Sequence, residues 1–424
     1  MITKETLKEV ILSNREFILK DVGHIVRREA FPSLGIPNKI VVLYGVRRSG
    51  KTFVLYDLFR NYGDTALYVD FEDERLTGFQ TGDFENLKES FLELDPSLLS
   101  KNKLFLLDEI QNVPGWEKFC RRMAEKEKVN VVVTGSSSRM MPYEIHTSLR
   151  GRSWSTEITP FSFREYLKTK NINIDRNLIY TSRKVILKNL FSEYLKWGGF
   201  PEAVFSESPF DRTKILKEYL SAIFFRDLVE RYKIDNITLL ESLLDRLLTG
   251  SARKFSLSSF YKQYQGTFPF SKDSLFSYYK CFLRSMLIFE VRKFSESSYT
   301  RMRNPAKIYL IDQGMAKRVT SDDLGWLLEN VVFLELRKRS SAICYFEEEK
   351  ECDFITKEEG RFSAYQVSFE LNEENKEREA AGLVSCCKRL RLKNGTILTY
   401  DQEEELRRQG MKITVIPVWK WLLL

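Results

Sequence analysis

Residues 45–52, GVRRSGKT, constrain the fold more than any other part of the chain, because they match the phosphate-loop pattern G-x-x-x-x-G-K-[ST] in full. An apolar, β-branched run at residues 39–44 precedes this segment, and a helical pattern at residues 51–61 follows it. In such a strand–loop–helix context, glycines let backbone N–H groups converge on phosphate oxygens. The alternative is a chance glycine-rich turn, which the flanking strand and helix disfavour.

The loop also predicts how a nucleoside triphosphate and its metal ion would be held. Lys51 is expected to reach the β- and γ-phosphates, and Thr52 is expected to ligate Mg²⁺. The amino end of the helix adds its positive dipole. The residues expected to contact the nucleotide are Gly45, Val46, Arg47, Arg48, Ser49, Gly50, Lys51, Thr52 and Phe53.

A second apolar strand, LFLLDE at residues 104–109, ends in two acids. In a parallel sheet, such a strand end lies at the same edge as the phosphate loop. Asp108 is predicted to hold Mg²⁺, directly or through water, and Glu109 to polarise the attacking water. Thr134 ends the next apolar run and could sense the γ-phosphate, although strand-end hydroxyls are often simple caps. The alternative to a metal site is a strand that merely ends in two solvated acids.

Short apolar runs alternate with helical patterns through the first part of the chain. The runs are residues 39–44, 65–71, 104–107 and 130–134, and the helical patterns are residues 51–61, 84–99 and 116–127. This alternation predicts an α/β fold with a doubly wound parallel sheet. The predicted domains are an N-terminal helical segment (1–30), a phosphate-loop domain (31–165), a helical lid (166–234), a winged helix (235–320) and a small α/β domain (321–424).

Residues 235–320 are predicted to form a winged helix-turn-helix, because three helical patterns are followed by two strand-like runs. Residues 236–312 contain twelve Lys and Arg against six Asp and Glu, so they carry most of the chain's net charge of +8. This asymmetry favours contact with DNA. The predicted DNA-contacting residues are Lys280, Arg284, Arg292, Lys293, Arg301 and Arg303. The alternative is a module that packs against protein and keeps a solvated basic face.

Several other kinds of site and compartment are disfavoured. The six Cys show no paired metal-ligand spacing, and the two His lie far apart, which argues against a metal site built from Cys or His and against a Ser/His triad. The first 20 residues carry charges throughout, and no apolar run approaches the length of a membrane span. A cytoplasmic protein without membrane association is therefore expected.

Five segments together resemble the prokaryotic AAA-type ATPases that carry a C-terminal restriction-endonuclease-like (PD-(D/E)xK) domain. They are GVRRSGKT, LFLLDEIQ, VVVTGSSS, LRGRSWSTEITPFSFREYL and YLKWGGFPEAV. The resemblance implies ATP as the nucleotide, Asp108 and Glu109 as Walker B residues, and Thr134 as a sensor. It also implies an arginine finger at Arg152, or alternatively at Arg150, that acts within a homo-oligomer such as a hexameric ring. The competing interpretation of Arg152 is a surface ion pair.

The same resemblance assigns two further regions. The turn at residues 198–201 ends at Pro201 and is similar to a turn that packs near the adenine in related ATPases; the alternative is a plain turn between helices. In the C-terminal domain, the resemblance implies a nuclease site of carboxylates and a lysine. The matching positions are Glu335, Asp353, Gln366 and Ser368. Because Gln and Ser stand where an acid and the lysine are expected, a degenerate domain without cleavage is predicted.

These observations predict Mg²⁺-dependent ATP binding and hydrolysis that drives or switches a DNA-associated oligomer. The alternative is a slow, nucleotide-switched regulatory or defence scaffold that binds protein rather than DNA. A small-molecule kinase is disfavoured, because the chain has large accessory domains and no evident acceptor site.

Overall fold

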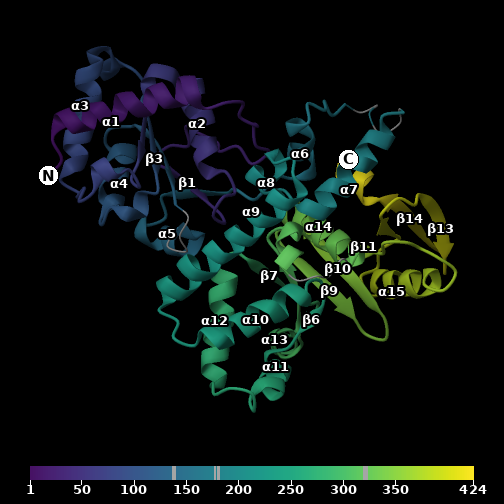
Figure 1. The fold of residues 1–424 in the computed structure, drawn as a ribbon. Coiled ribbons are helices and arrows are strands. Elements are labelled where there is room, and N and C mark those ends of the chain that lie inside the picture. The colour runs from purple at the N-terminus through teal and green to yellow at the C-terminus, as the bar shows by residue number, and fades with distance from the viewer. Residues whose placement is uncertain (136–139, 176–177, 179–181, 319–322) are drawn as a thin grey trace. The chain divides into compact units, whose positions relative to one another are not determined.

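The computed structural model describes residues 1–135, 140–175, 178, 182–318 and 323–424. The chain forms two compact units, Met1–Thr159 and Pro160–Leu424, whose elements are labelled in Figure 1. In the described part of the chain, no helix is both long enough and apolar enough to cross a membrane.

The first unit contains a five-stranded parallel sheet with the strand order β2-β3-β4-β1-β5. Its strands are β1 (Ile40–Tyr44), β2 (Ala66–Asp70), β3 (Leu104–Asp108), β4 (Asn130–Thr134) and β5 (Ser153–Glu157). Its helices are α1 (Lys4–Glu16), α2 (Lys51–Tyr62), α3 (Asp83–Leu94), α4 (Trp116–Glu125) and α5 (Pro142–Ser148). The predicted parallel sheet is confirmed, and its first four strands lie within one residue of the predicted runs. The edge strand β5 was not predicted.

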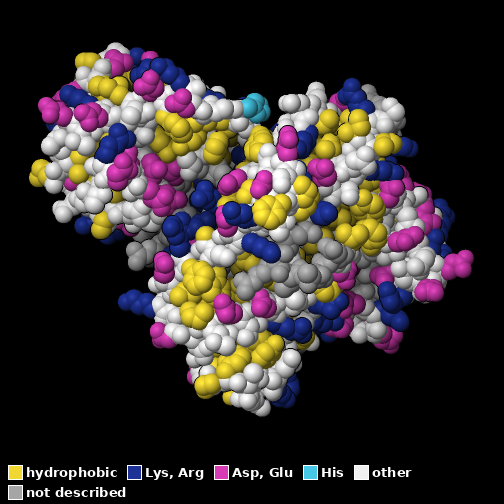
Figure 2. Space-filling model, in the orientation of Figure 1, with side chains coloured by type: hydrophobic (Ala, Val, Ile, Leu, Met, Phe, Trp, Pro, Cys, Tyr) yellow, Lys and Arg dark blue, Asp and Glu magenta, His cyan; other side chains and the backbone are white. Residues whose placement is uncertain are grey.

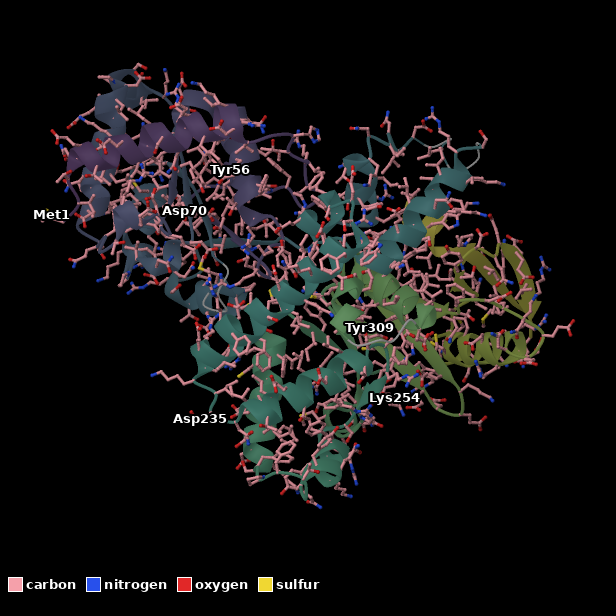
Figure 3. All side chains as sticks on the ribbon, in the orientation of Figure 1. Met1, Tyr56, Asp70, Asp235, Lys254 and Tyr309 are labelled. Atoms are coloured by element: carbon pink, nitrogen blue, oxygen red, sulfur yellow. The ribbon has the colours of Figure 1, made fainter. Side chains whose placement is uncertain are left out.

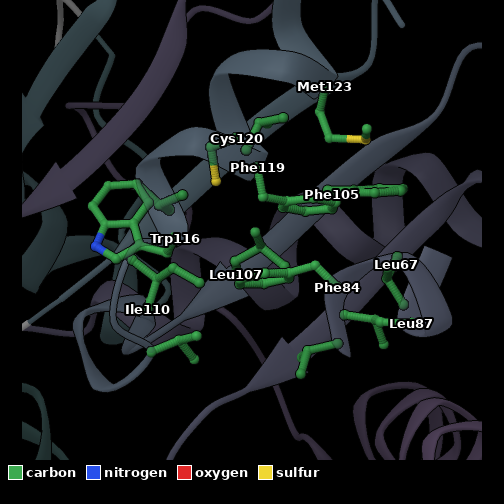
Figure 4. Packing of buried hydrophobic residues seen from close by; sticks show 14 of the residues in the cluster. Leu67, Phe84, Leu87, Phe105, Leu107, Ile110, Trp116, Phe119, Cys120 and Met123 are labelled. Carbon is green, nitrogen blue, oxygen red and sulfur yellow. The ribbon is translucent and has the colours of Figure 1, made fainter. Parts of the chain in front are cut away.

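Both faces of this sheet are buried along β1, β2, β3 and β4, so each of these four strands contributes to two cores. In β1, for example, Val42 belongs to the core under α1, α3, α4 and α5, whereas Val41 belongs to the core under α2. Figure 4 shows the first core, where Phe84 of α3 stacks on Phe119 of α4 with ring centroids 4.3 Å apart. Burial on both faces explains why these strands are near-continuous apolar runs. It leaves the carboxyl-terminal edge of the sheet as the place for polar chemistry.

The second unit contains a helical region and a nine-stranded mixed sheet with the order β13-β14-β12-β11-β10-β9-β7-β8-β6. Its helices are α6 (Phe163–Thr169), α7 (Lys184–Trp197), α8 (Pro201–Phe205), α9 (Pro209–Ala222), α10 (Ile237–Thr249), α11 (Leu257–Tyr264), α12 (Lys272–Arg284), α13 (Ser298–Arg303), α14 (Leu324–Arg339), α15 (Lys376–Arg389) and α16 (Val418–Trp421). Its strands are β6 (Lys254–Phe255), β7 (Ile288–Lys293), β8 (Ala306–Leu310), β9 (Ile343–Glu347), β10 (Glu351–Glu358), β11 (Arg361–Val367), β12 (Asn394–Thr399), β13 (Glu404–Arg408) and β14 (Met411–Pro417).

The sheet crosses the predicted boundary between the winged helix and the C-terminal domain. The three helices and two strands predicted before that boundary are present as α10, α11, α12, β7 and β8. However, β7 pairs in parallel with β9, with Arg292 opposite Cys344 and Lys293 opposite Tyr345. A lone β7–β8 ribbon would leave the backbone groups along the outer edge of β7 unpaired, and β9 satisfies them. The two predicted domains therefore share one sheet.

Candidate functional site

The backbone of the loop between β1 and α2 requires glycine at two positions. Gly45 has a φ of +148° and Gly50 a φ of +96°, in the left-handed half of backbone space. A Cβ atom on Gly45 would lie 2.2 Å from the carbonyl oxygen of Ile158, so no side chain fits there. Because Gly50 is the N-cap of α2, no side chain caps the first N–H groups of that helix. The loop can therefore present these groups to an anion.

Lys51 and Ser49 supply polar groups inside this loop. Lys51 is buried, and its Nζ donates to the carbonyl oxygens of Gly45, at 3.2 Å, and Val46, at 3.1 Å. Ser49 is fully buried, and its hydroxyl has no hydrogen-bond partner among the described residues. A buried hydroxyl without a partner costs free energy unless a ligand engages it. The residues of the loop therefore fit a bound phosphate.

Asp108 and Thr52 meet at the end of β3. Asp108 is buried, and the side chain of Thr52 lies close enough to its carboxylate to lower its pKa. The hydroxyls of Thr134 and Tyr68 also donate to Asp108, the latter at 3.1 Å. Burial raises the pKa of Asp108, and the hydrogen bond from Thr134 opposes that rise. A hydroxyl and a carboxylate close together beside a phosphate loop are the oxygen ligands that Mg²⁺ prefers, so this pair fits the metal.

Glu109 follows directly at the mouth of the site. Its backbone is in the left-handed region, with a φ of +47°, which is a strained conformation for a non-glycine residue. Its N–H donates to the Thr134 hydroxyl at 3.2 Å, and its carboxylate accepts from the Gln111 side chain at 2.5 Å. The structure thus brings together Lys51, Thr52, Asp108, Glu109 and Thr134 at one edge of the sheet.

Two residues at this edge were missed by the sequence analysis. Asp70 ends β2 in register with Asp108, and it is labelled in Figure 3. Burial raises the pKa of Asp70 to about 6, and the charge of Asp108 adds to this rise. Arg28 is buried and donates to the carbonyl oxygen of Ser49 at 2.8 Å, so it braces the loop from behind. Aligning the ends of the predicted strands could have found Asp70, whereas no local pattern marks Arg28.

The remaining residues of the predicted nucleotide site lie as follows. Val46 is buried, Arg47 is half-buried and Arg48 is exposed. Phe53 is 51% exposed on α2 and packs against Tyr56, with ring centroids 5.5 Å apart. Pro201 is in the second unit, where it begins α8, and its contact with adenine stays a prediction. Ser136, in the segment after Thr134, lies outside the described residues.

Arg152 lies at the opposite edge of the sheet from its own phosphate loop. It precedes Ser153, which pairs with Ile40 at the amino end of β1, whereas the loop follows the carboxyl end of that strand. Five strand residues span about 16 Å. Arg152 forms an ion pair with Glu125 and donates to the Arg150 carbonyl oxygen at 3.1 Å. A finger role for Arg152 or Arg150 would therefore concern the site of a neighbouring copy, and it stays a prediction.

Two of the six predicted DNA-contacting residues, Lys280 and Arg284, are exposed on α12 and have no ion pair within the described chain. The other face of α12 is apolar and packed, because Leu275, Tyr279 and Phe282 are buried. The other four have partners on their own unit: Arg292 with Glu290, Lys293 with Glu347, Arg301 with the carbonyl oxygens of Ser295 and Glu296, and Arg303 with the Tyr299 hydroxyl. On the face in Figure 2, basic and acidic side chains are interspersed.

The four predicted nuclease positions do not form one cluster. Glu335 pairs with Arg339 at 2.8 Å and Lys338 at 3.8 Å, one turn further along α14. The hydroxyl of Ser368 donates to the carbonyl oxygen of Glu370 at 2.9 Å. The acid of α14 that shares a partner with Asp353 is Glu329, through the ammonium of Lys307. Only Asp353 and Gln366 are in contact, at 3.3 Å through the Asp353 N–H.

Comparison with known proteins places three family models along the chain. An AAA domain matches residues 37–167, a domain of unknown function (DUF8612) matches residues 188–324, and another (DUF4143) matches residues 324–421. An uncharacterized protein of Methanocaldococcus jannaschii is 37% identical over 100% of this chain and 96% of its own length. An uncharacterized protein of Haemophilus influenzae is 28% identical over 80% of this chain and 85% of its own length.

Among solved structures, a Walker-type ATPase of Pyrococcus abyssi is similar at 14% identity with a TM-score of 0.43. The match covers 67% of this chain and 92% of that one. None of the matched models describes an endonuclease.

Proposed function

We propose that this chain, which belongs to the same protein family as the 37% identical M. jannaschii relative and carries an AAA domain, binds ATP with Mg²⁺ and hydrolyses it. The observation that supports this proposal most is the phosphate loop with its buried Lys51 and unpartnered Ser49, beside the buried Asp108 carboxylate, whose pKa the nearby Thr52 side chain lowers. This arrangement places the phosphate loop next to the end of β3, although the two segments lie far apart in the sequence.

Each residue at this edge has a separate task in the proposed reaction. Lys51 and the loop N–H groups would bind the β- and γ-phosphates, and Ser49 would donate its unpartnered hydroxyl. Thr52 and Asp108 would hold Mg²⁺, which supplies positive charge at the β- and γ-phosphate oxygens. Glu109 would accept the proton of the attacking water, and Thr134 would keep Glu109 and Asp108 in place.

Replacement of Glu109 by glutamine tests the hydrolysis step. Glu109→Gln should bind MgATP as tightly as the wild type, because the loop and the metal ligands are unchanged. Phosphate release should fall by about 100-fold or more, because an amide does not accept the proton. Calorimetry and a phosphate-release assay measure the two quantities. Glu74→Gln, at an exposed position of the same unit, should leave both unchanged. Equal turnover in Glu109→Gln and the wild type would remove Glu109 from the mechanism.

We further propose that Arg152 completes the site of a neighbouring copy in an oligomer. Arg152→Ala should lose most turnover and keep nucleotide binding, since the residue is distant from its own loop. Mixing Arg152→Ala with Lys51→Ala should restore part of the activity, because a mixed assembly pairs an intact loop with an intact arginine. Arg121→Ala, at a half-buried position of α4, serves as the control. If mixtures are no more active than their separate components, the arginine does not act between copies.

Two exposed basic residues of the second unit bear on the partner of the ATPase. The exposed pair Lys280 and Arg284 on α12 supports contact with DNA. ATP turnover should then rise with duplex or single-stranded DNA, and the rise should fade as salt increases. The double variant Lys280→Ala/Arg284→Ala should lose the stimulation and keep basal turnover. If nucleotide instead changes the mass measured by light scattering and DNA has no effect, a protein-binding switch is the better account.

A further inference from the structure

A buried lysine is surrounded by three carboxylates in the second unit. Lys307 of β8 is 3% exposed, and its Nζ lies 2.7 Å from Asp353 Oδ1, 2.7 Å from Glu351 Oε1 and 3.2 Å from Glu329 Oε1. These acids come from β10 and α14. An ammonium has three hydrogens to donate, and here each has a carboxylate oxygen within reach. We call these four residues the Lys307 cluster.

Further hydrogen bonds fix the oxygens of the cluster. Tyr309 donates to Glu329 at 2.7 Å, and the Val367 N–H donates to Asp353 Oδ2 at 2.9 Å. Lys254 donates to Glu351 at 2.7 Å from the neighbouring strand β6. Tyr309 and Lys254 are labelled in Figure 3. The carboxylates are therefore held around the ammonium by groups from several elements.

Gln366 limits the negative charge beside the cluster. Its amide donates to Glu379 at 2.7 Å, and its oxygen accepts from the Asp353 N–H at 3.3 Å. A carboxylate at position 366 would lie against that of Glu379 and would repel it. The neutral amide instead joins the Glu379 carboxylate to the Asp353 N–H.

The resemblance to endonuclease-like domains implies a divalent metal at this place, and the residues do not fit one. A metal ion binds carboxylate oxygens at about 2.0–2.6 Å, so it would share oxygens with the Lys307 ammonium and lie a few ångströms from it. Two cations so close repel strongly in a buried site. Lys307 cannot move aside easily, because its side chain is buried and its strand, β8, is paired on both sides, with β7 and β6. Glu335, the other expected ligand, pairs elsewhere on α14.

The lack of a fit for a divalent metal does not come from a closed entrance to the Lys307 cluster. A cleft of about 450 Å³ opens beside the cluster and is lined by Glu329, Asp353, Gln366 and Glu379. A hydrated metal ion could reach these side chains from solvent. The metal ion is therefore excluded because the carboxylates already bind the Lys307 ammonium.

We propose that the Lys307 ammonium is the resident cation of this carboxylate cluster and takes the place of a divalent metal. The cluster joins β8, β10 and α14 through charge, and it supports no metal-dependent cleavage of nucleic acid. This proposal does not depend on the ATPase function of the first unit.

Manganese binding to the nucleotide-free full chain tests the proposal, with free Mn²⁺ counted by electron paramagnetic resonance. Wild type and Asp353→Asn should bind the same number of Mn²⁺ ions, since the cluster holds none. Lys307→Ala should bind one more ion per chain, because it frees three carboxylates, and Lys307→Ala/Asp353→Asn should lose that ion. Lys254→Ala removes a partly exposed lysine beside the cluster and should gain no ion.

A thermal measurement covers the case in which Lys307→Ala folds poorly. Mn²⁺ should then raise its melting temperature and leave that of the wild type unchanged. Three results would overturn the proposal: an Mn²⁺ ion in the wild type that Asp353→Asn removes, no gain of binding or melting temperature in Lys307→Ala, or Mn²⁺-dependent DNA nicking by the wild type that Asp353→Asn abolishes.

Discussion

Lys51→Ala should reduce ATP turnover by at least about 100-fold, the typical cost of removing one group that stabilises charge in a transition state. The substitution removes the only buried ammonium described inside the loop. It also leaves the carbonyl oxygens of Gly45 and Val46 without the donor that Lys51 provides. We expect weaker MgATP binding as well, because the loop loses both charge and support. Steady-state phosphate release and calorimetry with MgATP measure the two effects.

Lys103→Ala is a matched control for this substitution. Lys103 also donates to two backbone carbonyl oxygens, those of Leu98 at 2.9 Å and Lys101 at 3.0 Å. It precedes β3 and therefore lies at the amino edge of the sheet, away from the phosphate loop. Its loss should leave turnover unchanged. If Lys51→Ala keeps wild-type turnover, the assignment of the nucleotide site is wrong. If both variants lose turnover equally, the loss reflects the fold rather than the phosphates.

The central strands of the first unit could be predicted from the sequence because both faces of the sheet are buried. Burial makes β1, β3 and β4 continuous apolar runs that any reading of hydropathy detects. The edge strand β5 has the sequence SWSTE, with no continuous apolar run, and its residues are half-buried or exposed. Its position follows from pairing with β1, which is a contact between distant segments.

The residues of the nucleotide site divide in the same way, into those that a local pattern predicts and those that depend on contacts between distant segments. Lys51, Thr52 and Asp108 lie in contiguous motifs whose spacing carries the chemistry. Asp70 joins them only because β2 lies beside β3 in the sheet, and Arg28 only because its segment passes behind the loop. Such residues are determined by the order of strands and by long-range packing, neither of which a local pattern encodes.

In the second unit, the sequence does not determine which acid of α14 joins the Lys307 cluster. Helix α14 has buried residues around most of its circumference, so its sequence does not indicate which of its acids faces β10. The motif predicts Glu335, whereas Glu329 is the acid that shares Lys307 with Asp353. Lys307 itself could not be anticipated as a member, because it comes from β8, before the predicted domain boundary. The shared nine-stranded sheet brings it there.

Lys307→Met should lower the free energy of unfolding of the second unit by about 3–5 kcal/mol, the usual cost of removing one partner from a buried ion pair. Methionine fills a similar volume but leaves three carboxylates without their shared cation. Burial already raises the pKa of Glu329 to about 7, against the lowering effect of the Lys307 charge. Without that charge, the carboxylates should take up protons in the folded state. Urea unfolding followed by tryptophan fluorescence measures the change.

The pH dependence distinguishes this mechanism from a simple packing defect. In Lys307→Met the folded state should bind more protons than the unfolded state, so the stability of the variant should rise as the pH falls. The deficit relative to the wild type should therefore be smaller at pH 5 than at pH 8. Lys293→Met is the matched control, because its nearest carboxylate, that of Glu347, is 3.9 Å away and the pair is partly exposed. It should cost less than about 1 kcal/mol at both pH values. If Lys307→Met loses the same free energy of unfolding at pH 5 and at pH 8, the volume of the lysine side chain, rather than its charge, stabilises the second unit.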